Sequence, residues 1–267
     1  MTGLEFSGLT VRYGHGAAAH TAVDGFDLTV RPGTSHGLVG ESGSGKSTVA
    51  AAAVGLVLPT AGSIRLNGAD IVGRSAAARR ARRRVQLVFQ DPYSALDPRM
   101  PIGLSIAEGS RATGRSWSRA EQRSRVGELL ERVQIDPDRA SEPPSAFSGG
   151  QRQRITIARA LAAEPEVLIA DEITSALDVS VQGVVLNLLR ELQRELDLTV
   201  LFSSHNLAVV NYMCDSVSVM QAGRVVEAGP TSTVLAAPED AYTRELLASV
   251  PVMGRRMTWD EEERPGR

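Results

Sequence analysis

The chain has 267 residues, of which 42% are hydrophobic, enough to bury one large core or two closely joined subdomains. Its formal net charge of −2 argues against a generally basic nucleic-acid-binding protein, whose phosphate contacts need a surplus of cations. The longest apolar stretches, Thr48–Leu58 and Val181–Leu189, are much shorter than the roughly 20 residues that cross a bilayer, so we expect no membrane-spanning segment.

The N-terminal part of the chain predicts strands followed by a glycine-rich loop and a helix. Apolar or alternating residues predict strands at Leu4–Val11, Asp24–Val30 and Ser35–Val39. The glycine-rich segment Gly40–Gly45 follows the third strand directly, and the Ala- and Val-rich segment Lys46–Leu56 predicts a helix. This order of strand, loop and helix is what a phosphate-binding unit requires.

The central part of the chain changes from strands to helices. Ser63–Leu66 and Val85–Phe89 predict two more strands, with an arginine-rich helix at Ser75–Arg84 between them. Across Pro92–Pro144 the apolar strand patterns are missing and the pattern is helical, most clearly at Arg119–Val133. We therefore expect a small helical subdomain inserted into an α/β core.

Strand patterns return in the last third of the chain. Val167–Ala170, Thr199–Ser203 and Ser216–Gln221 predict strands, and Ser148–Ala163 and Val181–Leu196 predict the helices that separate them. The alternation is typical of a parallel sheet with crossover helices.

One segment matches the P-loop (Walker A) pattern G-x-x-x-x-G-K-[ST] in full. It consists of Gly40, Glu41, Ser42, Gly43, Ser44, Gly45, Lys46 and Ser47. The glycines let backbone N–H groups turn toward phosphates, and the helix that begins near Lys46 directs the positive end of its dipole at them. We expect Lys46 to reach the β- and γ-phosphates of ATP, Ser47 to offer its hydroxyl to Mg²⁺, and Thr48 to lie beside the α-phosphate.

Lys46 is also the single lysine among 29 cationic residues, the other 28 being arginine. A genome-wide bias toward arginine would explain the 28 but not the exception. An ammonium is a compact charge whereas a guanidinium is a planar fork that needs more room, so a tight phosphate site resists exchange of the two.

An apolar strand that ends in two acids, Asp171 and Glu172, has the form of a Walker B segment. Asp171 would hold Mg²⁺ through water and Glu172 would polarise the attacking water. Two acids after a strand can equally be a solvated strand end, so the P-loop is what makes this interpretation strong.

A third motif distinguishes among nucleotide-binding proteins. Ser148, Gly149, Gly150 and Gln151 stand where Ser148 can N-cap the following helix. Without further context such a segment is more often a flexible turn. With the P-loop and the Walker B acids it resembles the signature of ABC ATPases, which contacts the γ-phosphate of the nucleotide bound to the opposite subunit.

The other elements of that family occur in the family's order. The resemblance implies that Tyr13 stacks on adenine, that Gln90 is the Q-loop glutamine near Mg²⁺ and the water, and that His205 is the switch histidine at the γ-phosphate. The segment Ser175–Asp178 resembles the D-loop, whose Asp178 communicates across a dimer.

Two positions depart from the family's usual pattern, which has Pro where Ile173 stands and Asp where Asn206 stands. These changes put the geometry of two loops in doubt but remove no catalytic group. Because Glu172 and His205 are both present, a degenerate site is not expected.

The resemblance also implies the fold class and the domains. We expect an α/β protein with a P-loop NTPase (RecA-like) core, an N-terminal antiparallel β subdomain and an inserted α-helical subdomain at about 91–165. Residues 1–230 would form the ABC ATPase domain, and 231–267 a short C-terminal extension whose end, Asp260–Arg267, is expected to fray.

Two stretches narrow the resemblance to the ATPase subunits of oligopeptide, dipeptide and nickel importers. They are Val88–Met100 and Tyr242–Leu247, the latter followed by Val250 and Pro251. The implied partners are a second ATP-binding subunit, identical or different, two transmembrane permeases, and an extracytoplasmic substrate-binding protein acting through them. The chain would sit peripherally on the cytoplasmic face of the cell membrane, and its sequence does not name the cargo.

A few other features are expected to be structural. The segment Met1–Thr10 has no basic start followed by a long apolar run, which predicts no secretory signal and favours the cytoplasm. Cys214 is the only cysteine and is expected to be a small buried residue. His15, His20 and His36 belong to no motif and are expected to be solvated or structural.

Two alternatives remain at this point. A soluble ABC protein acting on DNA or ribosomes is disfavoured, because only 102 positions separate Lys46 from Ser148 with no coiled-coil heptads between them and because there is one cassette. A non-hydrolysing ATP sensor is disfavoured by the presence of Gln90, Glu172 and His205. The basic run Arg79–Arg84 could contact nucleic acid or anionic lipid, but a solvated helix face is the simpler interpretation.

Overall fold

The computed structural model describes residues 3–14, 16, 19–114 and 118–248. His15, Val250, Pro251 and the predicted frayed segment Asp260–Arg267 lie outside these residues.

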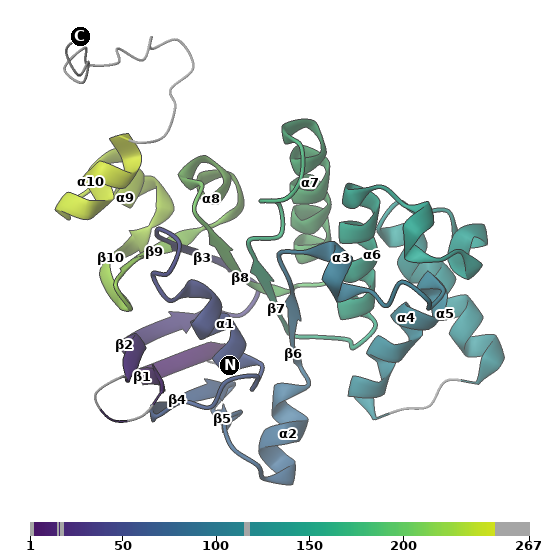
Figure 1. Ribbon diagram of the computed structural model, residues 1–267, viewed down its shortest axis with the longest axis horizontal. Coiled ribbons are helices and arrows are strands. Elements are labelled where there is room, and N and C mark those ends of the chain that lie inside the picture. The colour runs from purple at the N-terminus through teal and green to yellow at the C-terminus, as the bar shows by residue number, and fades with distance from the viewer. Residues whose placement is uncertain (1–2, 15, 17–18, 115–117, 249–267) are drawn as a thin grey trace, which may run out of the picture.

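The described strands form two sheets (Figure 1). The first is antiparallel, in the order β2-β1-β4-β5, with bounds β1 Leu4–Tyr13, β2 His20–Val30, β4 Ala61–Leu66 and β5 Ala69–Asp70. The second has the order β10-β9-β3-β8-β7-β6 and is parallel except for the β9–β10 pair. Its bounds are β3 Ser35–Val39, β6 Val85–Val88, β7 Val167–Asp171, β8 Thr199–Ser204, β9 Ser216–Gln221 and β10 Arg224–Pro230.

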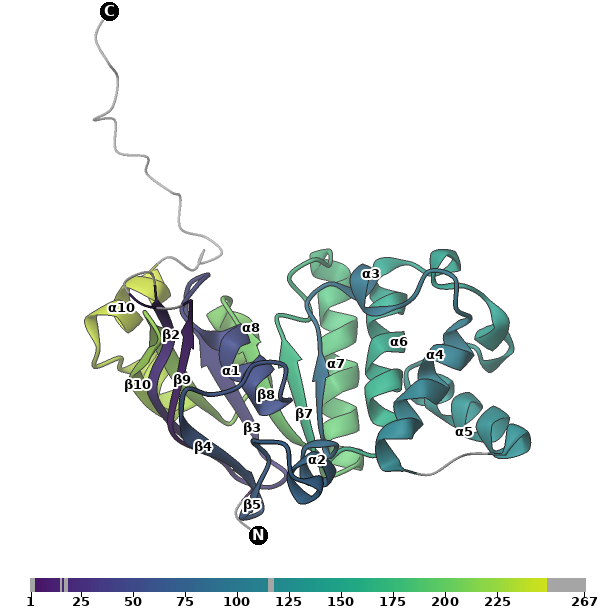
Figure 2. The same ribbon diagram turned by 60° about the horizontal axis from the view of Figure 1, so that its bottom comes forward.

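Helices join these strands, and most of those between β6 and β7 stand apart from the antiparallel sheet in both views (Figure 2). The four described helices between β6 and β7 are α3 Pro92–Ala95, α4 Ile102–Gly109, α5 Arg119–Arg132 and α6 Gly149–Leu161. Short 3-10 turns lie between them at Ser110–Thr113, Pro137–Ser141 and Pro144–Ala146. The remaining helices are α1 Lys46–Ala53, α2 Ala76–Arg82, α7 Val179–Glu195, α8 Leu207–Met213, α9 Thr231–Ala236 and α10 Ala241–Ala248.

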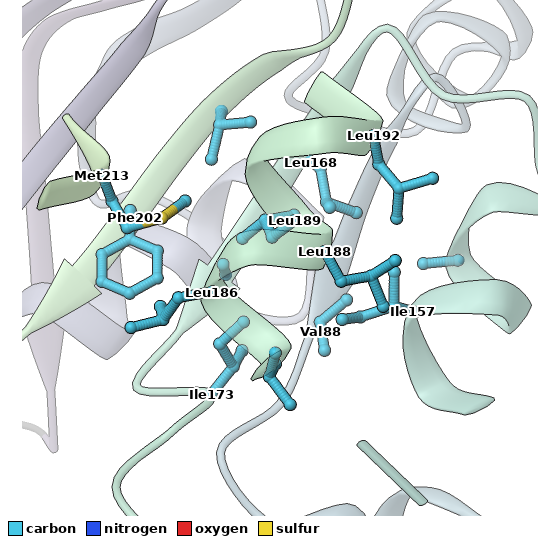
Figure 3. Close-up of a cluster of buried hydrophobic side chains, with 14 of the residues drawn as sticks. Val88, Ile157, Leu168, Ile173, Leu186, Leu188, Leu189, Leu192, Phe202 and Met213 are labelled. Carbon is cyan, nitrogen blue, oxygen red and sulfur yellow. The ribbon is translucent and has the colours of Figure 1, made fainter. Parts of the chain in front are cut away.

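Two hydrophobic clusters hold these layers together. The larger one packs α6, α7 and α8 against one face of the parallel sheet, and Figure 3 shows Leu188, Leu189 and Leu192 of α7 among residues of α6 and the strands. The smaller one fills the space between the other face, α1 and the antiparallel sheet. All five residues of β7 are buried, as expected of a central parallel strand covered on both faces.

The predicted fold class is confirmed: an α/β core carries an N-terminal antiparallel sheet and a group of helices inserted between two of its strands. The helix predicted at Lys46–Leu56 ends earlier, at Ala53, because Gly55 has a positive φ of 74° and turns the chain. Strands β5 and β10 and helices α8, α9 and α10 were not predicted. These elements have eight residues or fewer, which is too short to show a clear period.

The predicted burial of Cys214 is also confirmed, and burial raises the pKa of its thiol. His20 is exposed, whereas His36 is structural. The Nδ1 atom of His36 lies 2.7 Å from Ser216 Oγ, and its Nε2 atom lies 2.9 Å from Ser218 Oγ. A neutral imidazole can donate to one hydroxyl and accept from the other, so it satisfies both bonds inside the sheet.

Acid is expected to destabilise the protein through His36. Burial lowers the pKa of this histidine from 6.5 to about 4, so the unfolded chain binds the proton more readily. The free energy of unfolding should therefore fall as pH decreases from about 6.5 to about 4, by about 3 kcal/mol at full extent. Denaturant unfolding at a series of pH values measures this effect. The free energy of unfolding of His36→Gln should change less steeply with pH across this window than that of the wild type. The exposed-site variant His20→Gln should keep the wild-type slope, and parallel curves for wild type and His36→Gln would contradict the assignment.

Candidate active site

The glycine-rich loop between β3 and α1 is shaped by close backbone contacts. Gly45 has a φ of 107°, and a Cβ atom there would lie 2.5 Å from the carbonyl oxygen of Ala22. A Cβ atom on Gly40 would lie 2.2 Å from the carbonyl oxygen of Met220. Both positions therefore require glycine, and the loop is held in one path before any ligand contacts it.

Lys46 lies inside the loop that precedes it, with only 3% of its side chain exposed. Its Nζ atom donates to the carbonyl oxygens of Gly40 at 2.8 Å and Glu41 at 2.9 Å, and it lies 3.6 Å from Glu172 Oε1. Burial lowers the pKa of Lys46, and the nearby Glu172 and Asp171 partly oppose this shift. The ammonium group is thus a fixed positive charge beside the loop.

Hydroxyl and carboxylate oxygens meet where β7 ends. Ser47 Oγ at the start of α1 donates to Asp171 Oδ1 at 3.2 Å, and Ser203 Oγ at the end of β8 donates to the same oxygen. Mg²⁺ prefers oxygen ligands, and it is usually bound through one or two carboxylates together with water and substrate phosphates. The chemistry of this donor set therefore fits Mg²⁺ held together with a phosphorylated ligand.

Glu172 follows in a left-handed backbone conformation, with φ of 49°, which is uncommon for a residue with a side chain. Ser203 holds this turn, because the Glu172 N–H bonds to its carbonyl oxygen at 3.2 Å and to its hydroxyl at 3.1 Å. The carboxylate is mostly buried and lies between Lys46 and the exposed His205, whose Nδ1 atom is 3.7 Å from Glu172 Oε2. Such an acid can accept a proton from a water molecule held beside it.

Gln90 joins this group from the segment after β6, the strand that pairs with β7. Its Nε2 atom donates to Ser175 Oγ at 2.9 Å, and Ser175 Oγ donates to the carbonyl oxygen of Glu172 at 2.9 Å. The residue that follows β6 by two positions is therefore connected to the backbone of the turn at Glu172 through one hydroxyl.

A cavity of about 380 Å³ collects most of these groups. It is lined by Tyr13, His20, Ala22, Ser42, Gly43, Gly45, Lys46, Ser47, Thr48, Gln90 and Glu172. Tyr13, which is 44% exposed, lines this cavity together with the glycine-rich loop between β3 and α1. A ligand with a flat apolar part and an anionic part fits such a lining.

The segment that begins α6 does not line this cavity. Ser148 and Gln151 form a capping box, in which Ser148 Oγ accepts from the Gln151 N–H at 3.4 Å and Gln151 Oε1 accepts from the Ser148 N–H at 2.9 Å. A Cβ atom on Gly150 would lie 2.2 Å from Val181 Cγ1, so glycine lets α6 pack closely on α7. The N–H groups of the first turn lie at the start of a 13-residue helix, where an anion is favoured.

Asp178 stands at the N-terminus of α7 and is exposed, and its side chain makes no capping bond. The two departures from the family pattern are both accommodated. Ile173 is buried in the core, and the side chain of Asn206 caps α8 by accepting from the N–H groups of Ala208 and Val209. Asn206 can thus perform the capping that an aspartate would provide.

Sequence analysis did not assign Ser203, His20 or Ala22 to this site. Ser203 is the last residue of the predicted strand before His205, and its role depends on the pairing of β8 with β7. The only signal for it was a hydroxyl at the carboxyl end of a parallel strand, which is where ligands bind in such sheets.

Comparison with known proteins gives the family. The family described as ABC transporter matches residues 23–175. The chain belongs to this family.

Its relatives and structural neighbours agree with this ABC assignment. A Brucella ovis protein described as a peptide import ATP-binding protein is 47% identical to this chain. The match covers 93% of this chain and 78% of that protein. A Brucella abortus protein of the same description is 50% identical, over 86% of this chain and 69% of that protein. Among solved structures, cbiO1 from Clostridium perfringens, part of the cbiONQ ABC transporter complex, has 30% identity and a TM-score of 0.77, covering 89% of this chain and 92% of its own.

The dimeric ABC transporter cassette MJ0796 is also similar, with 26% identity and a TM-score of 0.74, covering 85% of this chain and 98% of its own. This ABC protein is therefore a nucleotide-binding ATPase, and its hydrolysis of ATP is coupled to transport. Within its described residues no helix is both long enough and apolar enough to span a bilayer.

Proposed function

We propose that this chain is the ATP-hydrolysing subunit of an importer for peptides, with nickel or another small solute as the alternative cargo. The observation that carries the proposal is the cavity in which the P-loop, Gln90 and Glu172 meet. The peptide cargo rests on the 47–50% identical relatives, which are named for peptide import.

The residues at the cavity have distinct roles in this proposal. Tyr13 stacks on the adenine ring, and the loop Gly40–Gly45 surrounds the phosphates with its N–H groups. Lys46 donates to the β- and γ-phosphates, and Thr48 lies beside the α-phosphate. These groups bind the nucleotide and hold its γ-phosphate beside Glu172.

Ser47, Asp171 and Gln90 would hold Mg²⁺, which supplies charge neutralisation at the phosphates when bound. Glu172 orients a water molecule and accepts its proton, because its carboxylate is fixed by the turn at Ser203. His205, which lies next to Glu172, donates to the γ-phosphate.

A second ATP-binding subunit completes the site. The helix that begins with Ser148, Gly149, Gly150 and Gln151 offers first-turn N–H donors to the γ-phosphate held by the partner, among them those of Gly149 and Gly150, which lie outside the capping box. Asp178 faces the partner across the dimer. These contacts exist only in the closed dimer, so bound nucleotide shifts the population toward closure and hydrolysis releases it. The partner is either identical to this chain or a different subunit of the same kind.

A groove of about 320 Å³ lies next to the Q-loop, on the side of the molecule that carries the inserted helices. It is lined by residues of β6, α3, α4 and α6, among them Arg159, and by Phe89, which follows β6 and is 47% exposed. We assign this groove to a cytoplasmic helix of a permease. The chain would then sit on the cytoplasmic face of the membrane, under two permeases that receive cargo from an extracytoplasmic binding protein.

Uptake measurements in the source organism test this function. Deletion of the coding sequence should abolish uptake of radiolabelled di- and oligopeptides, and the wild-type gene should restore it while Glu172→Gln should not. If the deletion abolished nickel uptake but left peptide uptake intact, the cargo would be nickel and not peptides. Intact uptake of both, with no association of the chain with membranes, would contradict the role in transport.

A further inference from the structure

The C-terminal helix α10 is attached firmly to the rest of the fold. The carboxylate of Glu227 on β10 accepts from the N–H groups of Glu239 and Asp240 at 3.0 and 3.1 Å, and Asp240 Oδ1 accepts from the Tyr242 N–H at 2.8 Å. The ring of Tyr242 is only 7% exposed and packs in the larger hydrophobic cluster together with Leu246. The position of this side chain is therefore determined by the hydrogen bonds at the start of α10 and by the packing of its ring.

The hydroxyl of Tyr242 reaches the phosphate-binding loop. It accepts a hydrogen bond of 3.0 Å from the N–H of Glu41, the second residue of the P-loop motif. The carbonyl oxygen of Glu41 in turn accepts from Lys46 Nζ at 2.9 Å. Burial raises the pKa of Tyr242, so the phenol is neutral at physiological pH.

The same C-terminal region holds the loop at a second point. The N–H of Gly223, in the turn between β9 and β10, donates to the carbonyl oxygen of Ser44 at 3.0 Å. The loop is thus bonded near its start by α10 and near its end by the β9–β10 turn. Both bonds come from residues about 180 to 200 positions away in the sequence.

We propose that Tyr242 is a positioning residue for nucleotide binding. Its hydroxyl fixes the peptide between Gly40 and Glu41, and thereby the Gly40 carbonyl oxygen, which accepts from the Lys46 ammonium at 2.8 Å. The inference depends on the proposed function of the cavity as an ATP site. It makes the C-terminal extension part of the nucleotide site, although α10 does not line the cavity. Loss of one hydrogen bond between neutral groups corresponds to about a two- to ten-fold weaker binding equilibrium.

The substitution Tyr242→Phe removes the hydroxyl and keeps the ring. We expect it to raise the Kd for MgATP and the KM by about two- to ten-fold, with kcat within about two-fold of wild type. In nucleotide-free protein, hydrogen exchange at the Glu41 amide should become faster. Tyr212→Phe is the matched control, because Tyr212 donates its hydroxyl to Asn187 on α7 and lies on α8, outside the cavity lining.

Three outcomes separate the possibilities. Faster exchange at Glu41 together with a raised KM in Tyr242→Phe, and neither in Tyr212→Phe, supports the proposal. Wild-type exchange and wild-type nucleotide affinity overturn it, even if the thermal midpoint falls, because Tyr242 would then serve only in packing. Failure of the wild-type chain to bind MgATP would contradict the proposed role of the cavity as an ATP site. The hydrogen-exchange measurement at Glu41 would still test the contact with Tyr242.

Discussion

Replacement of Glu172 by Gln is expected to lower ATP turnover by about two to four orders of magnitude while nucleotide binding is kept. Glutamine has nearly the same shape and can keep the turn at Ser203, but it cannot accept a proton from water. The backbone bonds that hold the turn, from the Glu172 N–H to Ser203, do not involve the side chain. Phosphate release and nucleotide titration on the same preparation measure the two effects.

Glu164→Gln is the matched control for this experiment. Glu164 also has a positive φ, 50°, and its replacement makes the same change of charge on an exposed surface. Its turnover should equal that of the wild type. Turnover within a few-fold of wild type in Glu172→Gln would remove Glu172 from its role as base and leave the proton acceptor unassigned.

The second large effect is expected at Lys46. Lys46→Ala should weaken MgATP binding by about 100-fold or more, because charge-assisted hydrogen bonds to the phosphates are lost. Lys46→Arg should fail to restore binding, although the charge is kept. The Nζ atom lies within 2.9 Å of two loop carbonyl oxygens, which leaves no room for a planar guanidinium. Calorimetric titration with nucleotide measures both variants.

Arg80→Ala, on the exposed face of α2, removes one positive charge outside the cavity lining and serves as the control. It should bind nucleotide as the wild type does. If Lys46→Arg bound with wild-type affinity, the site would require only a positive charge, and the argument from the shape of the ammonium would be wrong.

Local patterns were sufficient to predict most of the fold. The strand, loop and helix around Gly40–Gly45 could be read from sequence because each element is specified by neighbouring residues: apolar strand, glycines, then helix formers. The insertion of helices between β6 and β7 could be predicted for the same reason, since α5 begins with a capping box at Ser118 and Glu121. The short elements β5, β10 and α8–α10 could not, because none is longer than eight residues and so none is long enough to show a clear period.

The candidate site shows the same division. The sequence indicated Lys46, Asp171 and Glu172, and the structure brings these three together. It did not indicate Ser203 or the contact of Tyr242 with Glu41, which spans 201 positions and depends on how α10 packs. The roles of the site residues stay predictions until variants are measured.

The near absence of lysine from this chain gives an experimental opportunity. Apart from the α-amino group, Lys46 carries the only primary amine of the polypeptide, and its side chain is enclosed by the loop that it serves. Amine-selective acylation at this position would therefore act as a native reporter. Its rate would follow how often the loop opens, without an engineered probe and without interference from other side chains.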